Sequence, residues 1–211
     1  YWFDRSEESS ERFYDCQRRA IETVIYCHEV LQTRSLKELY QHVAPDTLNL
    51  SKAFSDEVEA SPFSKLCLKM ATGTGKTWVL IALLAWQYFN AARNEKPSGA
   101  SGVSSDWYSQ KFLIVTPGHE VMNRILDAFK GPMDPDTGLR NRLKADAVRS
   151  LFAPSELQRD FNFEILEPQD VRPNTSPPDS PFVFITNWQQ FQLKSDKDSL
   201  WEMLTGAEVE E

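Results

Sequence analysis

The first third of the chain has the hydrophobic spacing of helices. Between residues 11 and 31, apolar residues recur at steps of three and four, which predicts one amphipathic helix. Its expected apolar face consists of Phe13, Cys16, Ala20, Val24, Cys27 and Leu31. A second short helix is predicted over 35–43 with Ser35 as its N-cap, and a further helical turn within 48–58.

From about residue 64 onward, apolar runs alternate with helical patterns. Continuous apolar runs of this length are typical of strands buried on both faces of a parallel sheet. Such runs predict strands at 65–70, 111–115 and 181–185, and the alternation of apolar and polar residues at 161–166 predicts a further strand. The predicted helices are 76–93, 119–130, 139–152, a short one opened by a capping box at 155–158, and a helical turn from 188. The alternation predicts an α/β fold with a parallel sheet, joined by polar loops at 94–110, 131–138 and 172–181.

Composition places the chain among globular proteins. It has 211 residues, of which 41% are hydrophobic and 26% charged, enough to form a sizeable core. No apolar run approaches the ~20 residues of a membrane-spanning helix, and the first ten residues do not resemble a signal peptide. The three cysteines, Cys16, Cys27 and Cys67, follow no metal-binding or disulfide pattern, so we expect a reducing, cytoplasmic location without a membrane partner.

The net charge of −8 argues against a protein that coats nucleic acid by bulk electrostatics. The net charge does not exclude a local basic groove. Its best candidate is the stretch with Arg140, Arg142, Lys144 and Arg149, and the alternative is a solvated helix face.

Residues 70–77 read M-A-T-G-T-G-K-T, between an apolar run and a helix pattern. This context is that of a phosphate-binding loop. Gly73 and Gly75 allow a tight turn that brings backbone N–H groups close to an anion, and the following helix N-terminus adds further donors. Lys76 can then reach the β- and γ-phosphates, and the Thr77 hydroxyl can bind Mg²⁺. The sequence therefore predicts a site for a nucleoside triphosphate.

Upstream of this loop, Gln17 follows two aromatic residues, Phe13 and Tyr14. A glutamine amide offers one donor and one acceptor and can match the edge of an adenine ring, on which an aromatic ring can stack. A solvated glutamine on a helix is the alternative, and the loop downstream favours the adenine interpretation.

Three predicted strands end in polar or flexible residues: residue 71 onward, Thr116-Pro117 and Thr186-Asn187. In open parallel sheets, ligands bind outside the carboxyl ends of the strands. We therefore expect these strand ends to form one functional edge.

Four segments together resemble the superfamily-two helicases and translocases, in particular the DEAD/DEAH-box motor of type III-like restriction endonucleases. LKMATGTGKTWVLIALLAWQ (68–87) resembles the Walker A segment, and FLIVTPGHEVMNRI (112–125) resembles motif Ia. FVFITNWQQF (182–191) resembles the strand and turn before the Asp-Glu box, and FYDCQRRAIETVIY (13–26) resembles the upstream glutamine motif. The Walker A segment is specific, whereas the other three are individually modest.

The resemblance implies a RecA-like P-loop NTPase lobe that uses ATP and Mg²⁺ and acts on nucleic acid; for this restriction family the implied polymer is double-stranded DNA and the implied role is host defence. Lys76 and Thr77 are the implied catalytic residues, with Thr77 on the Mg²⁺. The implied nucleotide-binding residues are Phe13, Tyr14, Gln17, Ala71, Thr72, Gly73, Thr74, Gly75, Lys76 and Thr77. The implied contacts to the nucleic-acid backbone are Thr116, Pro117, Gly118, Thr186 and Asn187; such contacts carry no sequence information, as a translocating motor requires.

The resemblance is incomplete, because the sequence contains no Asp-Glu box in the family's context, no second RecA-like lobe with its arginine finger and no restriction-nuclease segment. We expect residues 1–63 to be a helical segment with the glutamine motif, and 64–211 to be the first part of the lobe, cut before that box. The second lobe and a possible nuclease segment would be partners in the parent protein. Hydrolysis requires an acid that holds the metal, so this chain alone is expected to bind nucleotide without turnover. A P-loop kinase and a nonenzymatic nucleotide-binding module are the alternatives.

Overall fold

The computed structural model describes residues 2–3, 13–49, 51–61, 63–102, 106–145, 152–171 and 176–191. They group into two compact units. The first unit comprises Tyr1–Trp86 and Asn90–Tyr108, and the second comprises Gln87–Phe89 and Ser109–Glu211. The expected boundary at residue 64 stays a prediction. No helix within the described ranges has the length and apolar character needed to cross a membrane.

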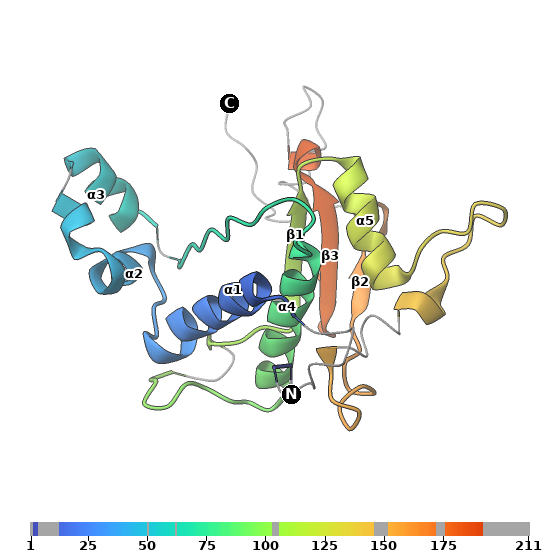
Figure 1. Cartoon of the computed structure of the whole chain (residues 1–211), viewed down its shortest axis with the longest axis horizontal. Helices are drawn as coiled ribbons and strands as arrows, with labels where there is room; N and C mark the ends of the chain where they lie inside the picture. The colour runs from blue at the N-terminus through green and yellow to red at the C-terminus, as the bar shows by residue number, and fades with distance from the viewer. Residues whose placement is uncertain are drawn as a thin grey trace. The chain divides into compact units, whose positions relative to one another are not determined.

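The first unit contains the predicted N-terminal helices. The elements are α1 (Asp15–Ile25), the π-helical turn η1 (Tyr26–Val30), α2 (Leu36–Val43), the 3-10 turn η2 (Pro45–Asn49), α3 (Lys52–Glu59) and most of α4 (Lys76–Ala92). The predicted cap of α2 is confirmed, because the Ser35 hydroxyl accepts a hydrogen bond from the Glu38 N–H. Figure 1 shows α2 and α3 side by side, and they contact each other.

The helix predicted over 11–31 is present in its described part, but its buried face differs from the expected one. Gln17 and Ile21 are the buried residues of α1, while Cys16 is exposed. The prediction for Cys16 was therefore wrong. The spacing of apolar residues allowed two neighbouring faces, and the structure buries the one that contains Gln17. The π-helical turn η1 adds one residue to the last turn, which brings Cys27 onto the buried side.

The first unit also contains a cluster of aromatic side chains around His28. The ring of His28 packs against those of Trp86, Trp107 and Tyr108, at centroid distances of 5.1, 5.6 and 5.2 Å. The Glu29 carboxylate accepts hydrogen bonds from Trp86 Nε1 (2.6 Å) and Tyr108 OH (3.2 Å). The segment 94–110, predicted as a polar loop, thus supplies two buried aromatic side chains that the sequence analysis did not single out.

The strand predicted over 65–70 is absent. This segment pairs with no strand of the described sheet, and Leu66 is 40% exposed. A strand requires a neighbour that pairs with its N–H and C=O groups, and none of the described residues provides one for this segment. The apolar run that precedes the glycine loop therefore stays extended without joining a sheet.

The second unit contains a parallel three-stranded sheet, as the sequence predicts. Its strands β1 (Lys111–Thr116), β2 (Glu164–Leu166) and β3 (Phe182–Asn187) lie in the order β1-β3-β2. Figure 1 shows α5 (His119–Lys130) alongside them, and α5 contacts both β1 and β3. Its buried face consists of Ile125, Leu126 and Phe129. Two 3-10 turns, η4 (Pro168–Asp170) and η5 (Trp188–Phe191), follow β2 and β3, and η5 corresponds to the helical turn predicted from 188.

A second aromatic group anchors the start of β2. Tyr88 and Phe161 lie 5.4 Å apart, and the Tyr88 hydroxyl contacts the carbonyls of Asp160 (2.7 Å) and Asn162 (2.8 Å). The helix predicted from 155 is wrong, because 155–160 forms a series of turns. Six residues before a buried strand are too few to form a stable helix.

Of the helix predicted over 139–152, residues 142–145 and 152 are helical, and residues 146–151, including Arg149, lie outside the described part of the chain.

Candidate functional site

The glycine loop begins after the extended segment and ends where α4 begins, at Lys76. Gly73 and Gly75 have φ angles of +82° and +72°, which other residues adopt only at a cost. At Gly73 an added Cβ would meet nothing within 4 Å, so its backbone conformation is the requirement there. At Gly75 the space is also occupied, because a Cβ would lie 2.3 Å from Gln17 Nε2.

The side chain of Lys76 folds back over the loop. Its Nζ donates to the Ala71 carbonyl at 2.9 Å, and the Thr74 hydroxyl donates to the same carbonyl at 2.7 Å. An ammonium group therefore lies over the loop at the N-terminal end of a 17-residue helix. Both the helix dipole and the ammonium charge favour an anion at this position.

Gln17 links α1 to the loop. Its side chain is 2% exposed, and its Nε2 donates to the carbonyls of Thr74 (2.9 Å) and Gly75 (3.3 Å). Its Oε1 accepts from the Tyr14 N–H at 2.8 Å, which caps the start of α1. The structure thus brings Gln17 to the loop that the sequence placed it with, and it shows bonds to the loop that the sequence analysis missed.

The two aromatic candidates beside Gln17 differ in their surroundings. The Phe13 ring packs on Trp78, in the first turn of α4, at 5.7 Å and on Trp2 at 6.1 Å. Tyr14 is 66% exposed. A hollow of about 360 Å³ lies next to the loop, lined by Cys16, Ala20, Cys67, Leu68, Lys69, Met70, Ala71 and Thr74. Its volume lies at the lower end of the range of small-ligand pockets.

Of the three strand ends predicted to form one edge, the structure brings two together: the carboxyl ends of β1 and β3 lie next to each other in the second unit, while the segment before residue 71 forms no strand. Thr116 pairs with Asn187 in register, and the Thr116 hydroxyl contacts the Thr186 carbonyl at 3.1 Å. Thr116, Thr186 and Asn187 are all buried, whereas Pro117 is exposed and Gly118 half-buried. The three buried side chains therefore support the turns at this edge, and Pro117 and Gly118 lie closer to its surface.

Two further residues, Trp188 and Gln189, complete the edge. Trp188 Nε1 and Gln189 Nε2 both donate to the Pro117 carbonyl, at 2.9 and 3.3 Å. They follow directly on the predicted Thr186-Asn187 pair, so the turn after β3 holds the turn after β1. The only sequence signal was their position in the strand-end motif.

Several buried oxygens at this edge make no hydrogen bond within the described part of the chain. They are Thr186 Oγ1, Asn187 Oδ1 and Gln189 Oε1. Asn187 Nδ2 lies 3.4 Å from His119 Nδ1, at the N-terminus of α5. Buried polar atoms are normally satisfied in a complete protein, so this edge has capacity for donors that the described residues do not supply.

The loop fits a triphosphate better than it fits a complete metal site. The described residues contain no group of three or more His, Cys, Asp or Glu side chains that could hold a metal ion. Mg²⁺ in nucleotide sites usually takes one or two carboxylates in addition to the phosphates. Thr77, half-buried at the start of α4, is the oxygen donor that this loop offers.

These features define an α/β protein with a glycine-containing phosphate-binding loop and a parallel sheet whose strand ends form a second polar edge. Residues 11–200 match the family described as the type III restriction enzyme, res subunit, and the chain belongs to that family. Its fold is that of a partial RecA-like lobe, and members of the family bind ATP and contain a helicase or translocase domain. Comparison with curated proteins and with solved structures gave no match.

Proposed function

We propose that the chain is the ATP-binding part of a motor that translocates along double-stranded DNA in a restriction or antiviral defence enzyme. The observation that carries this proposal is the loop itself. Two glycines at positive φ, a helix N-terminus and a folded-back lysine leave room and charge for a triphosphate. Membership of the restriction family favours this motor over a P-loop kinase.

In this proposal the backbone N–H groups of residues 71–75 and the Lys76 ammonium bind the triphosphate. Lys76 leaves the Ala71 carbonyl, because the phosphates are the stronger acceptors for an ammonium group. Thr77 supplies one oxygen to Mg²⁺, which neutralises phosphate charge when it is bound. Gln17, with Phe13 and Tyr14, receives the adenine, and its bonds to Thr74 and Gly75 keep the loop in place.

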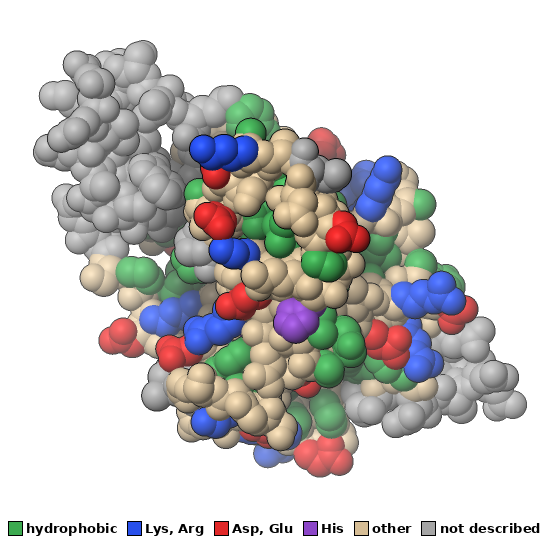
Figure 2. Space-filling view, turned by 90° about the vertical axis from the view of Figure 1, so that its left-hand side faces the viewer, with side chains coloured by type: hydrophobic (Ala, Val, Ile, Leu, Met, Phe, Trp, Pro, Cys, Tyr) green, Lys and Arg blue, Asp and Glu red, His purple; other side chains and the backbone are tan. Residues whose placement is uncertain are grey.

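The strand-end edge is proposed to contact the DNA backbone through the turns that begin at Thr116 and Thr186. The exposed Pro117 and the half-buried Gly118 provide the contacting backbone, while the buried Thr116, Thr186 and Asn187 hold it. Contacts through backbone N–H groups need little net positive charge, which suits a chain of net charge −8. On the side of the molecule that lies at the left of Figure 1, where α2 and α3 are drawn, basic and acidic side chains are intermixed (Figure 2).

The test is binding of a fluorescent ATP analogue to the 211-residue chain in the presence of Mg²⁺. Lys76→Ala is expected to weaken binding at least tenfold, because it removes the charge nearest the phosphates. Lys52→Ala, on the exposed side of α3, is the matched control and is expected to leave binding unchanged. Equal affinity of the Lys76→Ala variant and the wild-type chain would exclude the loop as the site. We expect no steady-state ATP turnover by this chain alone.

A further inference from the structure

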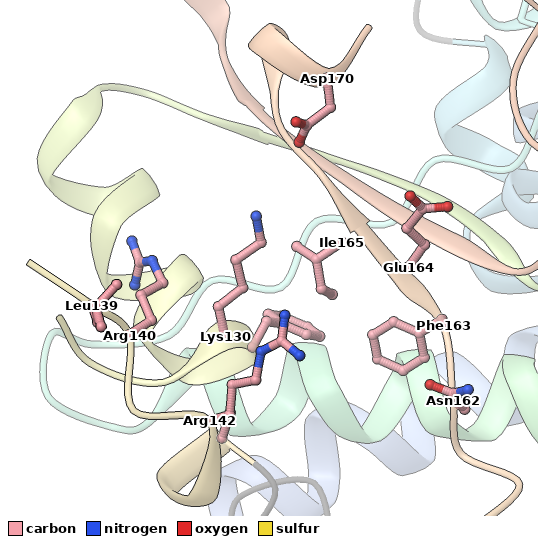
Figure 3. Close-up of a pocket in the computed structure, with 11 residues that line it drawn as sticks. Lys130, Leu139, Arg140, Arg142, Asn162, Phe163, Glu164, Ile165 and Asp170 are labelled. Carbon is pink, nitrogen blue, oxygen red and sulfur yellow. The ribbon is translucent and has the colours of Figure 1, made fainter.

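A hollow of about 850 Å³ in the second unit has no part in the proposed nucleotide and DNA sites. It lies between the C-terminal end of α5, the segment 139–145 and strand β2 (Figure 3). Its volume is in the range of pockets that bury a ligand or part of a partner chain. None of the residues that the family resemblance implies for nucleotide or DNA-backbone contacts lines it, but Arg140 and Arg142 of the basic stretch do.

The chain builds one wall of this hollow by a tight return after α5. Gly131 ends α5 with a φ of +84°, and a Cβ there would lie 1.9 Å from the Asn141 carbonyl oxygen. Met133 and Arg140 form an antiparallel bridge within the return. The return places the segment 139–145 opposite β2, and only glycine fits where its two ends meet.

Two basic side chains of this wall already form ion pairs within the chain. Arg140 Nη1 donates to Asp127 Oδ1 (2.7 Å) and to the Gly131 carbonyl (2.9 Å). Lys130 forms an ion pair with Glu167. Burial alone would raise the pKa of Glu167, but its hydrogen bonds, led by the one from Lys130, and nearby positive charges lower it overall. Both pairs therefore fix the wall.

Arg142 differs from these two cations. It is exposed and forms no ion pair with the residues that the structure describes. Figure 3 shows its guanidinium extending from one wall, with Ile165 on strand β2 and Phe163 just before that strand on the other wall. The hollow thus contains one positive charge, that of Arg142, that is not paired within the described residues, opposite apolar residues of the facing wall.

The same segment exposes apolar side chains. Leu139 is 71% exposed and lines the hollow, and Leu143, one residue beyond Arg142, is 80% exposed. Met133, on the opposite arm of the return, is exposed as well. Single exposed apolar residues are common, but several beside a hollow are typical of a surface that a partner covers.

Strand β2 presents a free edge at this place. It is the last strand in the order β1-β3-β2 of the described sheet. The Glu164 N–H donates to the Pro181 carbonyl at 3.0 Å, on the side of β3. Because successive residues of a strand direct their N–H and C=O groups to opposite sides, those of Ile165 face the free edge.

We propose that this hollow is a docking site for an extended protein segment that carries acidic and apolar side chains and adds to β2 as a further strand. Its backbone pairs with the free edge at Ile165, its apolar side chains cover Leu139 and the half-buried Ile165, and one carboxylate pairs with Arg142. Strand addition of this kind takes affinity from main-chain hydrogen bonds and specificity from alternate side chains.

The charges of the hollow argue against nucleic acid as the occupant. Glu164 and Asp170 line it together with the cations and would repel a phosphate backbone. Neither the exposed leucines nor the strand edge finds a complement in a sugar-phosphate chain. An extended peptide with apolar side chains, in contrast, needs to place only one carboxylate, at Arg142, and brings no further negative charge to Glu164 and Asp170.

The experiment selects random decapeptides, displayed on phage, against the immobilised 211-residue chain. We expect the enriched peptides to share an acidic residue flanked by apolar residues at alternate positions. A synthetic copy of the most enriched peptide is expected to lose at least tenfold in affinity for the Arg142→Glu variant. N-methylation of alternate backbone nitrogens is expected to weaken its binding for one set of alternate positions and not for the other, as strand pairing requires.

The matched control is Arg124→Glu, which makes the same charge change at an exposed position of α5 and is expected to change affinity less than twofold. Circular dichroism of both variants verifies that they fold. The proposal fails if acidic and apolar peptides are not enriched, or if they bind Arg142→Glu as tightly as wild type. It also fails if a labelled DNA duplex, and no peptide, shows the dependence on Arg142. Nucleotide affinity is independent of these outcomes.

Discussion

The amide of Gln17 occupies the space that a side chain at position 75 would need. Its Nε2 donates to the Thr74 and Gly75 carbonyls, and a Cβ on Gly75 would come within 2.3 Å of it. The Gln17 side chain can therefore occupy this position only if residue 75 has no Cβ. Gly75 is constrained twice, by its φ of +72° and by this contact, whereas Gly73 is constrained by its φ alone.

This difference predicts unequal effects of two alanine substitutions. Gly73→Ala is expected to cost ~1–2 kcal/mol, the price of a left-handed residue with a Cβ. Gly75→Ala has the same backbone cost and also displaces Gln17, which adds ~1–3 kcal/mol for lost hydrogen bonds in a buried place. The measurement is the urea dependence of unfolding for both variants. Equal destabilisation would show that the contact with Gln17 contributes nothing.

Replacement of Gln17 separates its two proposed roles. Gln17→Ala removes the side-chain donor from the Thr74 carbonyl and leaves the Gly75 carbonyl with the Trp78 N–H, so the loop is expected to lose order and ATP to bind several-fold more weakly. If Gln17 also reads adenine, the loss is larger for ATP than for GTP. Titration with both nucleotides measures this difference. The same loss for ATP and GTP would leave Gln17 as a residue that only positions the loop.

His28 predicts that stability depends on pH. Burial lowers the pKa of His28 below its ordinary value of 6.5, although the Trp107 backbone and Glu29 act in the opposite direction. Below about pH 6.5 the unfolded chain binds more protons at this position than the folded chain, so the free energy of unfolding falls as the pH falls. We expect the melting temperature to drop between pH 7.5 and 5.5.

The control for this prediction compares two histidines. His28→Gln is expected to reduce the slope of melting temperature against pH, while His42→Gln, at an exposed position of α2, is expected to keep it. A wild-type melting temperature that stays constant from pH 7.5 to 5.5 would contradict the role given to His28.

At the strand-end edge, Trp188→Phe removes the indole N–H that binds the Pro117 carbonyl while it keeps an aromatic ring. Gln189 retains its longer bond to the same carbonyl, so we expect the fold to persist and the turn after β1 to loosen. Affinity for a DNA duplex, measured by fluorescence anisotropy, is expected to fall several-fold with nucleotide affinity unchanged. Trp86→Phe, in the aromatic cluster of the first unit, serves as the control for loss of an indole N–H. Unaltered duplex affinity in the Trp188→Phe variant would count against a contact at Pro117.

The elements that could be predicted from sequence are those whose stability is local. The spacing of apolar residues in α5 and the Ser35 cap of α2 are contained in a few neighbouring residues, and both predictions were confirmed. The continuous apolar runs of β1 and β3 likewise predicted the parallel core of the sheet.

What could not be predicted depends on neighbours in space. The run at 65–70 has the composition of a strand, but a strand needs a pairing partner that composition does not reveal. The bonds of Gln17 to the loop join residues 57 and 58 positions apart, and the bonds of Trp188 and Gln189 to Pro117 span more than 70. Sequence patterns assigned these residues to motifs but could not predict which residues they contact.

The π-helical turn at Tyr26–Val30 sets the phase between two ends of one helical rod. At one end Gln17 holds the loop, and at the other Glu29 binds Trp86 and Tyr108. The π-helical turn takes up one residue more than an α-helical turn, so the same residues wound as an ordinary α-helix would rotate everything beyond them by ~100°. Glu29 would then face away from both donors. A single inserted residue between Gln17 and Tyr26 is therefore expected to separate either Gln17 from the loop or Glu29 from Trp86 and Tyr108.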